Sequence, residues 1–172
     1  MRKTITHCHA TVSIFQMISM KVEYNNLYTH FVLTTLNRMP IILEKNRQRI
    51  EKYIAGIVKN NDCHLYAIYA NPEHVHFLVS RSPKRDEESL ATIIADSSAR
   101  FINENQLCIG FFQWQQTCSA FSVSKKDVTM VCNYIETQKG RHSKQSYNDE
   151  YAEFLKHYQQ TLNQKENEVY EV

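Results

Sequence analysis

Two histidines separated by one residue, His74 and His76, are the pair whose type and spacing most clearly indicate chemistry in this sequence. The segment Glu73 to Ser80 reads as a β-strand, in which residues two apart point to the same face of the sheet. Both imidazoles should therefore project together, and two imidazoles so placed can hold one metal ion. The same spacing also occurs in ordinary surface strands, so the pair indicates a site only in combination with other residues.

A tyrosine and a glutamine four residues apart, Tyr134 and Gln138, form a second pair. The surrounding segment predicts a helix, on which residues i and i+4 lie one above the other. A hydroxyl and a carboxamide would then face the same point. Taken alone, the pair is also consistent with a packed tyrosine and a solvated glutamine.

Together, the two pairs are suited to a reaction on a phosphodiester. A metal held by two imidazoles and an amide oxygen has room for a phosphate oxygen, and as a Lewis acid it would polarise the phosphorus. A tyrosine hydroxyl, with a pKa of about 10, is a poor nucleophile that needs such an activated electrophile. A phenolate also leaves well enough to make the step reversible. The combination therefore indicates covalent catalysis, in which the enzyme stores a phosphodiester and passes it to another 3′-hydroxyl.

The rest of the chain predicts alternating strands and helices that would position these residues. Strands are expected over residues 26–35, 64–70, 73–80, 111–114 and 119–124, and helices over 43–59, 89–105, 127–138 and 147–160. In the strand that carries the histidines, Val75, Phe77 and Val79 should face the core. This order predicts an α+β fold, in which an antiparallel sheet carries its helices on one face.

Length and composition limit the classes of protein that the chain can form. Its 172 residues fit one domain, and an apolar fraction of 42% is enough for a real core. We predict an N-terminal extension over 1–19, a catalytic domain over 20–160 and a loose acidic tail over 161–172. No run of about 18 apolar residues is present, so the sequence predicts no membrane span.

The cysteines indicate a reducing compartment. They are odd in number and scattered, with no C-x-x-C motif, which is unlike a disulfide framework. The five are Cys8, Cys63, Cys108, Cys118 and Cys132. The N-terminus resembles a signal peptide only weakly, because polar residues interrupt its apolar stretch and no cleavage site follows. We therefore expect a cytoplasmic protein.

The net charge of +2 does not by itself indicate nucleic acid, but basic residues gather in two regions. One group follows the histidine strand and the other flanks the tyrosine helix. The candidates for contacts with DNA phosphates are Arg81, Lys84, Arg85, Lys125, Lys126, Lys139 and Arg141. An ordinary solvated surface explains the same residues equally well.

Several ordered motifs resemble the single-tyrosine HUH transposases of the insertion-sequence-200/605 group, where HUH means His, hydrophobic, His. The motifs cover the chain from about Asn26 to about Tyr158. They are Tyr28-Thr29-His30-Phe31-Val32, Glu73-His74-Val75-His76-Phe77-Leu78-Val79, Trp114-Gln115, Ala120-Phe121-Ser122-Val123-Ser124, and Tyr134-Ile135-Glu136-Thr137-Gln138.

The resemblance implies a role for each residue of the two pairs. Tyr134 would attack single-stranded DNA, forming a 5′-phosphotyrosine and freeing a 3′-hydroxyl. His74, His76 and Gln138 would ligate Mg²⁺ or Mn²⁺; two nitrogen ligands suit Mn²⁺ better, while Mg²⁺ prefers oxygen. The resemblance further implies a ferredoxin-like or RRM-like domain that binds hairpin-bearing element ends. It also implies a homodimer in which the tyrosine of one subunit serves the histidines of the other.

The sequence departs from the family pattern in two places, and three other readings stay open. Glu73 stands where Asp or Asn is commoner, and Thr117-Cys118-Ser119 replaces a segment that is often Gly-Tyr-Gly. The chain could instead be a domesticated repeat-associated nuclease with the same chemistry, or a nucleic-acid-binding relative without catalysis. A third reading is a zinc site built from Cys63, His64, His74 and His76, although the spacing matches no common zinc pattern.

Overall fold

The computed structural model describes residues 20–138 together with residues 152 and 156. The predicted extension over 1–19, the acidic tail over 161–172 and all but two residues of the helix expected over 147–160 lie outside the described residues. None of the helices in the described part is long and apolar enough to cross a membrane.

Four strands form one antiparallel sheet, as the sequence predicted. They are β1 (Tyr28–Thr34), β2 (His64–Ala70), β3 (His74–Ser80) and β4 (Ser119–Val123), in the spatial order β2-β3-β1-β4. This strand order, with one helix between β1 and β2 and another between β3 and β4, is that of a ferredoxin-like sheet. The two central strands, β1 and β3, pair Tyr28 with Ser80 and Thr34 with His74.

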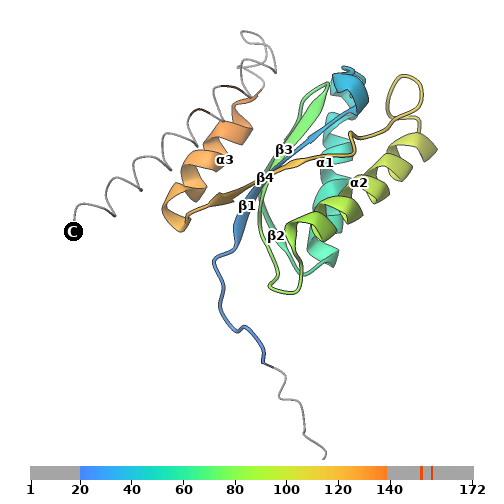
Figure 1. The fold of residues 1–172 in the computed structure, drawn as a ribbon. Coiled ribbons are helices and arrows are strands. Elements are labelled where there is room, and N and C mark those ends of the chain that lie inside the picture. The colour runs from blue at the N-terminus through green and yellow to red at the C-terminus, as the bar shows by residue number, and fades with distance from the viewer. Residues whose placement is uncertain (1–19, 139–151, 153–155, 157–172) are drawn as a thin grey trace, which may run out of the picture.

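The helices cover both faces of the sheet, which corrects the expectation of a single covered face. Figure 1 shows α1 (Glu44–Asn60) and α2 (Glu87–Glu104) on one side and α3 (Val128–Glu136) on the other. The residues of β3 from His74 to Val79 are all buried, so both faces of this central strand are covered. A strand that is buried on both faces gives little sequence alternation from which to predict where each helix packs.

Two hydrophobic clusters follow from this arrangement. The main cluster packs the side chains of α1 and α2 against Val75, Phe77 and Val79, which face the core as predicted. The second cluster lies on the other face, where Val131 and Ile135 of α3 pack with residues that include Leu78 and Val123. Alternate residues of β3 therefore belong to different clusters, as the pleat of a strand requires.

The prediction of a strand over residues 111–114 is wrong. This segment makes only one isolated bridge, between Trp114 and Thr35, before β4 begins. The side chain of Asn103 replaces the missing ladder, because its amide donates to the Phe112 carbonyl and its oxygen accepts from the Phe112 N–H. Phe112 and Trp114 are still buried in the main cluster, which is why the segment has the apolar pattern of a strand.

Replacing Ser98 with alanine should destabilise the protein by about 1–3 kcal/mol, because it leaves a buried indole N–H without an acceptor. Ser98 is fully buried on α2, and its hydroxyl accepts from Trp114 Nε1 at 2.9 Å. Urea unfolding followed by the fluorescence of Trp114, the single tryptophan, measures the loss. Ser97→Ala, the same change at the more exposed neighbour, should stay within about 0.5 kcal/mol of wild type. Equal losses in the two variants would contradict the expectation.

Candidate active site

His74 and His76 lie on β3 and point toward α3, on the same face, as their spacing predicted. Their ring centroids are 4.7 Å apart and the rings are nearly perpendicular, at 85°. His74 is fully buried and His76 is 4% exposed, so neither is an ordinary surface histidine. Burial of two adjacent imidazoles on the face away from the main cluster supports a site rather than incidental packing.

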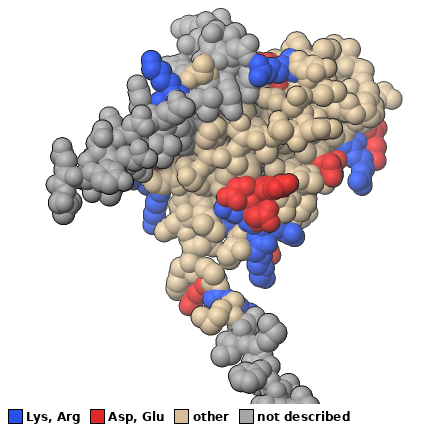
Figure 2. Space-filling model, in the orientation of Figure 1, with Lys and Arg blue, Asp and Glu red and all other residues tan. Residues whose placement is uncertain are grey.

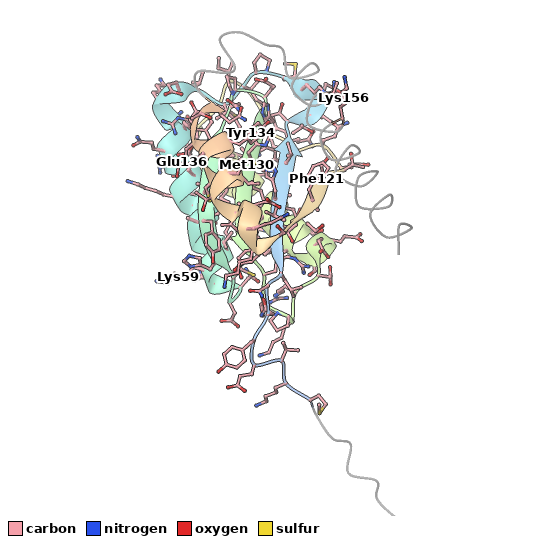
Figure 3. All side chains as sticks on the ribbon, turned by 90° about the vertical axis from the view of Figure 1, so that its left-hand side faces the viewer. Lys59, Phe121, Met130, Tyr134, Glu136 and Lys156 are labelled. Carbon is pink, nitrogen blue, oxygen red and sulfur yellow. The ribbon has the colours of Figure 1, made fainter. Side chains whose placement is uncertain are left out.

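Tyr134 projects from α3 toward this histidine pair within the same chain. Its half-buried ring lies with its centroid 5.6 Å from that of His76, at an interplanar angle of 89°. Figure 3, which looks onto α3, shows Tyr134 on the helix and Phe121 on β4. The two motifs therefore lie side by side in the structure, although almost sixty residues separate them in the sequence.

Gln138 also reaches the site, but not from the helix that was predicted to carry it. α3 ends at Glu136, and Thr137 is its C-cap, so Gln138 follows the helix instead of lying one turn above Tyr134 within it. Its side chain is nevertheless fully buried, with Oε1 3.5 Å from Nδ2 of Asn71. The end of α3 therefore delivers the carboxamide to the β2–β3 turn.

Asn71, in the turn between β2 and β3, connects His74 with Gln138. Its Nδ2 lies 2.9 Å from Nε2 of His74 and 3.5 Å from Oε1 of Gln138. Its backbone N–H also donates to the His74 carbonyl at 2.7 Å, which closes the turn. Asn71 thus lies between Nε2 of His74 and Oε1 of Gln138, which belong to two of the predicted metal ligands.

Glu73 keeps a carboxylate beside the site despite departing from the family pattern. Its Oε1 lies 3.5 Å from Nδ1 of His74. A carboxylate at one ring nitrogen of a histidine commonly orients the other nitrogen toward a metal. Nε2 of His74 would then be the ligand atom, and it would have to exchange its contact with the Asn71 amide for the metal, because one ring nitrogen has a single lone pair.

His30 on β1 is a third histidine beside this pair, and its sequence pattern predicted only a position in a strand. Its Nε2 lies 3.0 Å from Nδ1 of His76, and the two rings stack with centroids 5.2 Å apart. Burial lowers the pKa of His30 to about 3, so its ring is neutral near pH 7. The strand motif contained the signal, but only the pairing of β1 with β3 shows which neighbour His30 contacts.

The basic residues that were predicted to contact DNA, where the structure describes them, lie at the end of the sheet far from His74. Tyr28 pairs with both Ser80 and Val123, so the segments after β3 and β4 emerge at the same end. Those segments carry Arg81, Lys84, Arg85, Lys125 and Lys126. Lys139 and Arg141, the remaining candidates, lie outside the described residues.

These basic residues differ in how much of the side chain is available to a partner. Lys84, Lys125 and Lys126 are exposed. Arg81 is only 10% exposed, and it donates to the Thr29 hydroxyl at 2.8 Å and to the Glu87 carboxylate, which ties its loop to β1 and α2. Figure 2 shows basic and acidic side chains intermixed on the visible face of the described part.

The donor set fits a divalent cation held at an open site rather than a closed zinc site. Two imidazole nitrogens and one amide oxygen leave further coordination positions for water or phosphate oxygens. Within the described residues, no group of three or more His, Cys, Asp or Glu converges as a metal cage. The zinc alternative fails because His64 pairs with Ser80, about 20 Å along β3 from His74.

Solved structures of transposases share this fold. A candidate transposase from Deinococcus radiodurans R1 is 19% identical, covering 70% of this chain and 98% of its own, with a TM-score of 0.53. A REP-associated tyrosine transposase bound to a REP hairpin is 18% identical, covering 73% of this chain and 74% of its own, with a TM-score of 0.54. At these identities the likeness establishes the fold alone. The fold is therefore that of transposase structures.

The sequence itself establishes the family. The model of the family described as "Transposase IS200 like" matches residues 23–138, which include every strand and helix described above and the four residues of the predicted site. No curated protein matches the chain. The chain belongs to the IS200-like transposase family.

Proposed function

We propose that this transposase cleaves and rejoins single-stranded DNA through a covalent 5′-phosphotyrosine on Tyr134. The observation that carries the proposal is the position of the Tyr134 ring against the buried pair His74 and His76 of its own chain. Burying imidazoles and a carboxamide beside a tyrosine costs free energy, and packing of the tyrosine alone would not require these polar groups.

The reaction exchanges one phosphodiester bond for another. The Tyr134 oxygen bonds to phosphorus, the P–O3′ bond breaks, and the phenolic proton is balanced by the proton taken up at the departing 3′-oxygen. The reverse attack, by the 3′-hydroxyl of another strand, releases the tyrosine and joins the DNA. No water is consumed, so the free energy of the phosphodiester is conserved between the two steps.

His74, His76 and Gln138 are the residues that would hold Mg²⁺ or Mn²⁺ in this proposal. When bound, such an ion would supply Lewis-acid polarisation of the phosphate that Tyr134 attacks. Glu73 would orient His74 from the Nδ1 side of its ring, 3.5 Å away, while Asn71 would give up its contact with Nε2 when that nitrogen binds the ion. Burial of the pair excludes water, which strengthens the attraction between the site and a phosphate.

The DNA partner is proposed to be a single strand with a hairpin. The related REP-associated transposase was solved with a REP hairpin, which supports such a partner here. The exposed Lys84, Lys125 and Lys126 lie about 20 Å from His74, roughly the length of β3. They would therefore hold DNA phosphates remote from the bond that is cut, while Lys139 and Arg141 remain candidates beyond the described residues.

The same likeness favours a second candidate function, a domesticated repeat-associated tyrosine nuclease with identical chemistry. The two functions differ in the DNA that the gene accompanies. Element ends flanking the gene would favour a mobile element, and dispersed palindromic repeats would favour the nuclease.

A denaturing gel with labelled single-stranded DNA from the gene's own flanks tests the proposed chemistry. The wild-type protein should form a covalent adduct with Mn²⁺ or Mg²⁺ and none with EDTA, and Tyr134→Phe should form none. Tyr53→Phe is the matched control, because Tyr53 stacks on Phe101 on the opposite face of the sheet. An adduct that survives Tyr134→Phe, or no adduct with any flanking strand, would refute the mechanism and leave a binding-only relative.

A further inference from the structure

Three buried imidazoles lie in a row across two neighbouring strands. His30 of β1 contacts His76 of β3, and His76 contacts His74. In the register of the sheet, His30 is opposite Leu78, so it is the diagonal neighbour of His76 on the same face. Its ring is fully buried.

The contact between His30 and His76 has only two arrangements of protons. Full burial disfavours a charged ring, so the bond at 3.0 Å joins two neutral imidazoles, one as donor and the other as acceptor. If His76 donates from Nδ1, its Nε2 carries a lone pair that can bind a cation. If His30 donates instead, Nε2 of His76 carries the proton and cannot ligate.

We propose that His30 is a positioning residue that accepts a hydrogen bond from Nδ1 of His76 and thereby fixes the tautomer whose Nε2 can ligate a divalent cation. The inference rests on the proposed function, since it concerns the same metal site. Glu73 occupies the corresponding place at Nδ1 of His74. Each histidine of the pair thus has a polar side chain near Nδ1, a carboxylate at 3.5 Å for His74 and an imidazole at 3.0 Å for His76.

The surroundings of His30 limit the movement of its ring. Its centroid lies 6.1 Å from that of Tyr134 on α3 and 6.2 Å from that of Phe121 on β4. A ring packed between a helix and the neighbouring strand cannot turn away without displacing one of them. His30 therefore fixes the direction of the His76 ring as well as its tautomer.

The affinity of the DNA-free protein for Mn²⁺, measured by electron paramagnetic resonance of the unbound ion, tests the proposal. His30→Phe keeps a ring but removes the acceptor, and it should weaken binding about 10–100-fold. His30→Gln keeps an acceptor oxygen and should recover most of the affinity. Leu33→Val, a change on the other face of the same strand, should lower the melting temperature without weakening Mn²⁺ binding.

The outcomes separate this inference from the proposed function. If the wild-type protein does not bind Mn²⁺, the metal site itself is refuted. If the wild-type protein binds Mn²⁺ and His30→Phe binds it equally well, only the positioning role of His30 is refuted. The same holds if His30→Gln binds Mn²⁺ as weakly as His30→Phe does. The nitrogen NMR shifts of the metal-free wild-type protein give a second readout that needs no variant. They should show His76 protonated at Nδ1, and a proton on Nε2 would overturn the proposal.

Discussion

A mixture of Tyr134→Phe and His76→Ala proteins should form no covalent DNA adduct, just as neither variant forms one alone. The physical reason is that the proposed nucleophile and a proposed metal ligand lie side by side within one chain, with the Tyr134 ring centroid 5.6 Å from that of His76. Ile135, the next residue of α3, is fully buried in the second cluster with Leu78, which fixes the helix on its own sheet. Each variant therefore lacks one half of the proposed site.

The mixing experiment also tests the exchange of helices that the family resemblance implies. If Tyr134 of one subunit served the histidines of another, the mixture would contain intact sites and the adduct would reappear. The gel should be run after the two proteins have been unfolded and refolded together, so that subunits can exchange. A mixture of wild-type protein with Tyr134→Phe, treated in the same way, controls for recovery from refolding. A homodimer remains a prediction, and it is compatible with a site that lies within one chain.

Phe77→Ala should cost about 3–5 kcal/mol of stability, a large part of the roughly 5–15 kcal/mol that a domain of this kind has. Phe77 is fully buried on β3, and its ring stacks on that of Phe31 with centroids 5.1 Å apart. Removing the ring leaves a cavity between the sheet and the two helices of the main cluster. Urea unfolding monitored by circular dichroism measures the loss, which should appear as a lower midpoint with little change in slope.

Phe121→Ala is the matched control for this change. Phe121 is half-buried on the edge strand β4, so part of its ring is already in water and less transfer free energy is lost. Its loss of stability should be clearly smaller than that of Phe77→Ala. Equal losses would mean that the main cluster is not the principal source of stability.

Local sequence patterns were sufficient to predict the parts of the site that each lie on one element. The spacing of His74 and His76 placed both rings on one face, because a strand alternates strictly. The antiparallel sheet and the helix that carries Tyr134 were predicted for the same reason, since each element has its own hydrophobic period. The family motifs then joined the two pairs into one site.

Contacts between elements could not be predicted in this way. His30 meets His76 through the register of β1 against β3, and register depends on the whole sheet. Asn71 meets Gln138 through the packing of the end of α3 on the turn between β2 and β3, which no local pattern in either segment shows. The segment over 111–114 was misassigned because its two buried aromatic residues imitate a strand, whereas the Asn103 side chain satisfies the Phe112 backbone.

Tyr134, the proposed nucleophile, is carried by a helix that packs on the smaller of the two hydrophobic clusters. α3 adheres to the sheet through the second cluster, which is smaller than the main cluster and shares no buried residue with it. Lifting α3 would expose Val131 and Ile135 but leave Phe77 and its neighbours packed, so it requires less free energy than global unfolding. Such a partial opening would carry Tyr134, with any DNA bonded to it, away from His76. In the proposed reaction, the covalent intermediate would therefore reside on a nine-residue helix whose partial opening leaves the sheet that holds the histidines folded.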